Sequence, residues 1–189
     1  YSPVVTGVAF LPMIGALIVS STMSSQFLMP RFGPRILITA GLLIAAGGMV
    51  ILATQLDVTI SYAAWILPAL VVIGLGLGLV FGCGLNTATY GADAADAGVA
   101  SAMVNTCQQV GGSIGTALLN TIAASALSSY LVTHGTSPAA QAEAAVHSYV
   151  VAFWVSAAIF AGAAVVCALV LRSGVLTQKQ GVDAVPVPA

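Results

Sequence analysis

Charged side chains divide this sequence into five long stretches that contain none. Only 5% of the 189 residues are charged, four of them basic and five acidic. A charged group is costly inside a bilayer, and a helix needs about 20 predominantly apolar residues to span the hydrocarbon core. The charge-free windows are 1–30, 36–56, 58–92, 97–142 and 144–171. Each window is long enough to hold one membrane-spanning helix.

The overall composition also indicates a membrane protein. Hydrophobic residues make up 59% of the chain, whereas soluble domains carry about 25% charged residues. So few charged side chains cannot cover the surface of a water-soluble domain of this size. The formal net charge of −1 gives no reason to expect a nucleic-acid partner. We therefore expect the lipid bilayer to surround this chain.

The window 97–142 contains a polar cluster, Thr133 to Pro138, that is typical of a turn, so it holds one helix and a loop. We predict an all-α integral membrane protein in which residues 1–172 form an incomplete transmembrane bundle. Residues 173–189, which include Pro186 and Pro188, are predicted to form a disordered cytoplasmic tail. The five predicted transmembrane helices lie at about 4–29, 35–55, 61–85, 99–130 and 145–171.

The basic residues predict the orientation of the helices. Arg31 and Arg35 lie in the first connection, and Arg172 and Lys179 lie after the last helix, so all four fall on one side. Basic residues in short loops mark the cytoplasmic side. We expect a multi-pass protein of the cell membrane with its N-terminal end outside and its C-terminal end in the cytoplasm. Because the chain begins with Tyr1 and has an odd number of helices, we also expect it to be the C-terminal part of a longer protein.

The fourth predicted helix carries polar side chains on one face. At about 100° per residue, the polar and small residues around Asn105 share one sector, and the opposite side carries mainly apolar residues such as Val110 and Ile114. An unpaired amide in hydrocarbon costs several kcal/mol. The amides therefore either bond to other helices or line a wet cavity, and their number favours the cavity. The predicted path-lining residues are Asn105, Gln108, Gln109, Gly112, Thr116 and Asn120.

Two sets of glycines predict close helix packing. Gly74, Gly78 and Gly82 recur at every fourth position of the third predicted helix and form one small stripe. A neighbouring backbone can approach such a stripe closely. The run lacks the spacing and the strand–turn–helix context of a nucleotide-binding loop. Gly111 and Gly115 form a second small stripe beside the polar face of the fourth helix.

The segment "PRFGPR", from Pro30 to Arg35, predicts a tight turn between the first two helices. Its arginines are suited to bonding the carbonyl groups at a helix end or to pairing with acidic groups. The alternative interpretation is that Arg31 and Arg35 serve only as a topology signal.

Catalysis and metal binding find little support. "GGSIG" matches the GxSxG pattern with Ser113 as nucleophile, but a hydrolase needs a strand before that residue and a base beside it. His147 is expected near the outer surface, far from Ser113. Cys83, Cys107 and Cys167 lie in three different helices without metal-binding spacing and are interpreted as small buried apolar residues. We predict no catalytic residues, no metal and no cofactor.

The order of these motifs resembles the C-terminal portion of major facilitator superfamily transporters. The basic turn, the glycine-rich helix, the acidic "GADAADAG" loop and "NTCQQVGGSIGTALLNT" most resemble the fourteen-helix drug–proton antiporters of the EmrB/QacA type. The resemblance extends from Pro3 to Arg172. It implies the last five helices of the second six-helix bundle, without that bundle's first helix and without the N-terminal half.

The resemblance also implies roles for particular residues. Within the family's cytoplasmic-loop motif, G-x-x-x-D-R-x-G-R-R, the matching residues are Arg31, Gly33 and Arg35. Gln26, Pro30 and Pro34 replace the glycine, the aspartate and one arginine, so the motif lacks its carboxylate here. The family's proton-coupling acids belong to the absent half.

The function implied is efflux of small amphipathic molecules, driven by protons through alternating access. This chain and the missing N-terminal half would together bind the substrate and the protons. A facilitator-type permease for a sugar or metabolite is the nearest alternative. An intramembrane serine protease or a purely structural membrane subunit would be alternatives of a different class.

Overall fold

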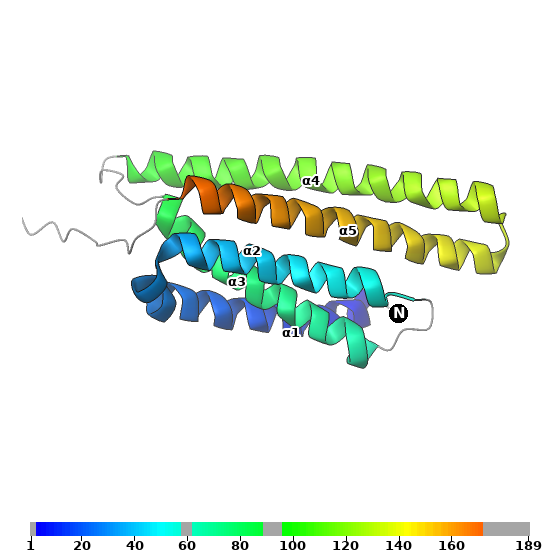
Figure 1. Cartoon of the computed structure of the whole chain (residues 1–189), viewed down its shortest axis with the longest axis horizontal. Coiled ribbons are helices and arrows are strands. Elements are labelled where there is room, and N and C mark those ends of the chain that lie inside the picture. Colours follow the sequence, from blue (N-terminus) through cyan, green and yellow to red (C-terminus); the bar gives the residue numbers. More distant parts are fainter. Residues whose placement is uncertain (1–2, 58–61, 89–95, 172–189) are drawn as a thin grey trace, which may run out of the picture.

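The computed structural model describes residues 3–57, 62–88 and 96–171, and every regular element in these ranges is helical. Short π-helical turns, Ser24–Leu28 and Tyr62–Ile66, lead into the second and third α-helices. The helices lie side by side with their axes close to one direction (Figure 1). The predicted all-α fold is confirmed. The five α-helices are α1 Pro3–Met23, α2 Met29–Gln55, α3 Leu67–Ala88, α4 Ala97–His134 and α5 Pro138–Val170.

These helices are long and apolar enough to cross a membrane. The chain reverses direction between α1 and α2 (Figure 1), although both belong to one continuous apolar helical segment, Gly7–Gln55. The other three segments are Tyr62–Gly84, Ala97–His134 and Pro138–Val170, with mean hydropathies of 2.5, 1.3 and 2.3. The segment that contains α4 is thus the least apolar.

The chain bends sharply at Gly33, which lies inside the range of α2 near its start. Its backbone angles, φ 72° and ψ 164°, interrupt the helical geometry where the sequence predicts a turn. A residue with a side chain rarely adopts such a positive φ. Gly33 and the adjacent Pro34 are buried, whereas Arg31 is exposed. The bend therefore brings a basic side chain to the surface near the start of α2.

The predicted start of the last helix at residue 145 is wrong. α5 begins at Pro138, where Ser137 caps it by accepting a hydrogen bond from the backbone N–H of Ala140 at 3.2 Å. A serine cap followed by proline in the first turn is a strong start signal. α4 is also longer at its C-terminal end than predicted, because it continues to His134. The predicted tail 173–189, together with Arg172 and residues 89–95, lies outside the described residues.

Glycines allow α3 to lie closely between α1 and α2. A Cβ atom at Gly78 would lie 2.5 Å from the carbonyl oxygen of Leu17, and one at Gly82 would lie 2.5 Å from that of Ser21. Gly74 faces the Met13 carbonyl group in the same way. On another side of α3, a Cβ at Gly76 would lie 2.5 Å from the backbone nitrogen of Ala45 in α2. Larger residues at these positions would force the helices apart.

Hydroxyl groups strengthen the contact between α1 and α3. Ser20 Oγ donates a hydrogen bond to the carbonyl oxygen of Leu75 at 2.7 Å. Ser24 Oγ lies 2.9 Å from Cys83 Sγ, and both side chains are fully buried. Such bonds between helices stabilise a bundle where no water is available.

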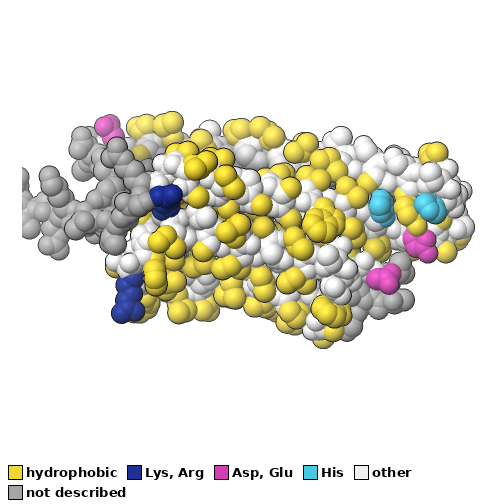
Figure 2. Space-filling view, viewed as in Figure 1, with side chains coloured by type: hydrophobic (Ala, Val, Ile, Leu, Met, Phe, Trp, Pro, Cys, Tyr) yellow, Lys and Arg dark blue, Asp and Glu magenta, His cyan; other side chains and the backbone are white. Residues whose placement is uncertain are grey.

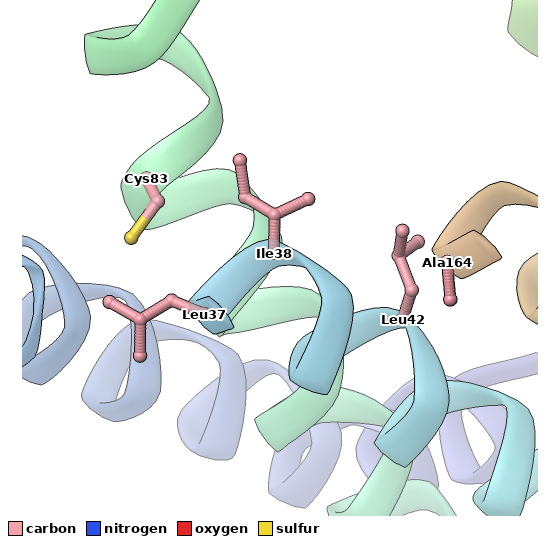
Figure 3. Packing of buried hydrophobic residues seen from close by; sticks show 5 residues of the cluster. All are labelled: Leu37, Ile38, Leu42, Cys83 and Ala164. Atoms are coloured by element: carbon pink, nitrogen blue, oxygen red, sulfur yellow. The ribbon is translucent and has the colours of Figure 1, made fainter. Parts of the chain in front are cut away.

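α2 is the central helix of the bundle, because it contacts both α3 and α5. Its apolar side chains Leu37, Ile38 and Leu42 pack with Cys83 of α3 and Ala164 of α5 (Figure 3). A second cluster joins Leu52 of α2 to Ala69 and Ile73 of α3. The interpretation of the cysteines as buried apolar residues holds for Cys83 but not for Cys107, which is exposed on α4. α4 contributes no side chain to either cluster.

Candidate functional site

α4 is the least covered helix of the described chain. It packs along α5 and touches α3 only briefly, and it lies at one edge of the helix arrangement (Figure 1). It contains no buried residue over its 38 residues. Most of its surface is therefore open to whatever surrounds this part of the protein.

The six predicted path-lining residues of α4 are all exposed, as is Ser101. With one residue every 100° or so, they occupy one sector of the helix. The opposite sector is apolar and equally uncovered, since Met103 and Ile114 expose 65% and 63% of their surface. Two chemically different faces of α4 are thus left open by α1, α2, α3 and α5. The polar residues are Asn105, Gln108, Gln109, Gly112, Thr116 and Asn120, here named the α4 polar face.

Half-buried residues show which side of α4 contacts α5. Val104, Gly115, Leu119 and Ile122 are less exposed than their neighbours and fall on a common side of the helix. That side borders the α4 polar face. The polar side chains therefore project beside the α4–α5 contact and are not enclosed by it.

The amides of the α4 polar face have no partner within the described chain. The structure shows no hydrogen bond from the side chains of Asn105, Gln108, Gln109 or Asn120 to residues in the ranges 3–57, 62–88 and 96–171. Hydroxyl groups on the same helix behave differently, since Thr106 Oγ1 donates to the Ala102 carbonyl oxygen at 2.9 Å. Hydrogen bonding among the helices described here therefore does not account for the amides.

The glycines of α4 meet open space. A Cβ atom added at Gly111, Gly112 or Gly115 would have no atom of another described element within 4 Å. The packing role predicted for Gly111 and Gly115 stays a prediction, and any close neighbour must lie outside the described residues. Gly74, Gly78 and Gly82 differ from them because α1 lies directly against that stripe.

The two ends of the molecule differ in charge. Figure 2 shows the arginine side chains of the described residues at one end and the histidines at the other. Within the turn, Arg31 is exposed and Arg35 is partly buried beside Gly33. Gln26 and Pro30, which stand where the resembled motif has glycine and aspartate, are also exposed. Among the described residues, no group of three or more His, Cys, Asp or Glu side chains is arranged to hold a metal ion.

Comparison with known proteins identifies the family. Residues 1–116 match the family described as Major Facilitator Superfamily. The chain is 47% identical over 153 residues to the puromycin resistance protein pur8 of Streptomyces alboniger, a match that covers 80% of this chain and 30% of the relative. The chain belongs to the Major Facilitator Superfamily. It is a multi-pass membrane protein of a transporter family.

Two further relatives carry related names. The tetracenomycin C resistance and export protein of Streptomyces glaucescens is 36% identical over 66% of this chain and 22% of its own length. The cephamycin export protein CmcT of Amycolatopsis lactamdurans is 35% identical over 68% of this chain and 26% of its own length. The chain thus spans less than a third of the length of these major facilitator relatives.

The protease alternative has no support in this major facilitator chain. Ser113 is exposed, and its Oγ donates to the carbonyl oxygen of Val110 at 2.9 Å within α4. The ring of His147 lies 5.2 Å from that of Tyr130. At about 1.5 Å per residue, Tyr130 lies roughly 25 Å along α4 from Ser113. The structure therefore does not bring His147 to the serine.

Sequence reasoning missed a cluster at the α4–α5 turn. Tyr130 of α4 contacts Glu143 and His147 of α5 and stacks on His134 of its own helix, and these four residues are here named the hairpin cluster. Each pair is spaced by four residues on its own helix, which places both members on one face. That spacing was the available signal, but the predicted helix starting at residue 145 left Glu143 in a loop.

Proposed function

We propose that the full-length protein exports small amphipathic molecules across the cell membrane, driven by protons through alternating access, and that it is a transporter rather than an enzyme. The observation that carries the proposal is the α4 polar face, an exposed row of amides without partners in the described chain. Three relatives named for antibiotic resistance or export support the direction of transport.

The chemistry of the α4 polar face suits a cavity wall. An amide left unpaired in hydrocarbon costs several kcal/mol, so it must meet water, substrate or another polar group. Amides both donate and accept hydrogen bonds, which allows them to bind neutral polar groups of many shapes. The remainder of the full-length protein would supply the opposite wall of this cavity.

Protons would be carried by that remainder as well. A proton relay through a membrane depends on ionisable groups within the spanning helices. The windows 58–92 and 97–142, which include α3 and α4, contain no charged residue. We therefore assign to this chain the binding and guidance of substrate, and to the preceding part of the protein the coupling to protons, as expected of a fourteen-helix antiporter.

The charge distribution supports an orientation for the transporter. Arg31 and Arg35 at one end of the helices would face the cytoplasm. The α4–α5 turn, which contains His134, would then face the outside. Substrate would move along the α4 polar face from Asn105, near the cytoplasmic side, toward Asn120.

Drug accumulation in cells that produce the full-length protein tests this function. Puromycin is the first probe because one relative is named a puromycin resistance protein. We expect lower intracellular puromycin than in cells without the protein, and we expect a protonophore to abolish the difference. Equal accumulation of puromycin and of a panel of amphipathic drugs, with the protein shown to be in the membrane, would overturn export. Export that survives the protonophore would overturn the coupling to protons alone.

A further inference from the structure

The α4–α5 hairpin is longer than a bilayer is thick. α4 has 38 residues and α5 has 33, whereas about 20 residues span a hydrocarbon core of about 30 Å. Figure 1 shows the hairpin extending beyond the ends of α1, α2 and α3 at the α4–α5 turn. Roughly 18 residues of α4 and 13 residues of α5 exceed this length, so the part of the hairpin near its turn is available to project from the membrane.

The side chains support this placement of the membrane boundary. Tyr149 and Trp154 are exposed on α5 and Trp65 is exposed where α3 begins, and such aromatic residues concentrate at membrane–water interfaces. Beyond this level, the end of α4 is rich in small hydroxyl residues, and Glu143 and His147 are exposed. A carboxylate would be costly against lipid. The hairpin cluster therefore lies in water.

Tyr130 is the centre of the hairpin cluster. Its hydroxyl donates a hydrogen bond to Glu143 Oε2 at 3.0 Å. The ring of His134 stacks on it at a centroid distance of 4.0 Å, and the ring of His147 lies at 5.2 Å with a tilt of 37°. In the described chain, the bond from Tyr130 to Glu143 is the one side-chain hydrogen bond that joins α4 to α5.

Tyr130 also lies in the same angular sector of α4 as the polar face. At about 100° per residue, Tyr130 falls within roughly 20° of Asn105 and within roughly 60° of Gln109. Elsewhere, the half-buried residues on the side of α4 toward α5 are mainly apolar, such as Leu119 and Ile122. Apolar contacts are not directional, so they fix the rotation of a helix about its axis less firmly than a hydrogen bond does.

We propose that Tyr130 is a positioning residue, which fastens α4 to Glu143 of α5 outside the membrane and so holds the α4 polar face toward the substrate path. This proposal rests on the proposed function, because it assigns a purpose to the orientation of that face. Rotation is transmitted along α4 because the helix is one continuous hydrogen-bonded element from Ala97 to His134. When the bond is absent, α4 rotates about its axis, and its apolar face lines the substrate path for part of the time.

Cysteine labelling of the full-length protein measures this rotation without a transport assay. In a background free of native cysteines, Asn105→Cys reports the polar face and Ile114→Cys reports the opposite face. We expect a water-soluble maleimide to label the first site faster. Tyr130→Phe, which removes only the hydroxyl, should reduce the ratio of the two rates by about threefold to tenfold. Glu143→Leu should act alike, and both changes together should be no worse than either alone.

Conservative and matched variants distinguish a positioning role of Tyr130 from a general loss of folding. Glu143→Gln keeps an oxygen that accepts from Tyr130 and should preserve the labelling ratio. Ser128→Ala should also preserve it, because Ser128 Oγ bonds only to Ser125 within α4. In transport assays, Tyr130→Phe should raise KM and leave the amount of folded protein unchanged.

Three outcomes would overturn the proposal. The first is an unchanged ratio in both Tyr130→Phe and Glu143→Leu, with Asn105→Cys still labelled faster, which contradicts positioning and leaves the proposed function intact. The second is additive effects of the two changes. The third is equal labelling of Asn105→Cys and Ile114→Cys in the otherwise unaltered protein. That result would contradict a water-filled cavity beside the α4 polar face, and therefore both the proposed function and the role of Tyr130.

Discussion

At the scale of single residues, two glycines of α2 differ in backbone conformation and in surroundings. Gly33 has a φ of 72° at the kink near the start of α2. Gly47, on α2, has no atom within 4 Å of where a Cβ would lie. The same substitution at these two positions should therefore have opposite consequences.

We expect Gly33→Ala to destabilise the protein by about 1–2 kcal/mol, because an alanine disfavours the left-handed backbone. Gly47→Ala should be neutral or stabilising by up to about 1 kcal/mol, since alanine is the better helix former. Thermal unfolding of the detergent-solubilised protein provides the measurement. Equal melting temperatures for the two variants would show that the φ at Gly33 is not required.

At the scale of helices, packing divides the chain into a close group and an open helix. α3 lies against α1 and α2 through glycines, whereas α4 contacts mainly α5 and buries none of its residues. The small stripe Gly74, Gly78 and Gly82 was visible in the sequence as a spacing of four. The helix that would lie against it was not, because glycine spacing identifies a face but not its neighbour.

We expect Gly78→Ala to lower the melting temperature by several degrees. The added Cβ would lie 2.5 Å from the carbonyl oxygen of Leu17 and 2.6 Å from Ser20 Cβ, and overpacking of this kind costs about 1–3 kcal/mol. Gly15→Ala on α1, where the added atom meets open space, is the matched control. A variant at Gly78 as stable as its control would contradict the close contact between α1 and α3.

Sequence patterns predicted five helices but misplaced several of their ends: α1 ends at Met23 and not at 29, α2 begins at Met29 and not at 35, and α5 begins at Pro138 and not at 145. Charge-free windows identify apolar length, so Glu143 excluded the first turns of α5 from the prediction. Local capping by Ser137 overrides that single charge. The same error concealed the contact between Glu143 and Tyr130. The polar face of α4 was predictable because it depends only on helical period, whereas the absence of partners for its amides within the described chain required coordinates.

At the scale of the whole molecule, the distribution of charge and the open surface of α4 lead to predictions about topology and completeness. Arg31 and Arg35 lie at one end of the described chain and the α4–α5 turn lies at the other. The matched segments cover only 30% of one relative and 22% of another, so both relatives are much longer than this chain.

We expect cysteines placed at Arg35 and at Lys179, which lies outside the described residues, to face the cytoplasm. A cysteine at His134 should face the outside. Membrane-impermeant labelling of intact cells should therefore modify position 134 at once, and positions 35 and 179 only after permeabilisation. Labelling of position 134 only after permeabilisation would reverse the proposed orientation.

Residues 1–189 alone should not transport. The described helices leave the α4 polar face exposed, so we expect no closed path across the membrane. Vesicles that contain only these residues should accumulate no more puromycin than empty vesicles, whereas the full-length protein should give uptake in inside-out vesicles. Uptake by residues 1–189 alone, above that of empty vesicles, would show that the path is complete without the rest of the protein.

The most direct test of the central claim, that the α4 polar face lines the substrate path, is transport per folded molecule in Gln109→Leu of the full-length protein. We expect KM to rise about tenfold for at least one substrate, while Val110→Leu on another side of α4 changes little. The amount of folded protein should stay constant, because leucine makes the helix more apolar. If the amides instead bond helices together, Gln109→Leu should lower thermal stability with unchanged activity per folded molecule. An unaltered substrate profile in both Asn105→Leu and Gln109→Leu would contradict the account.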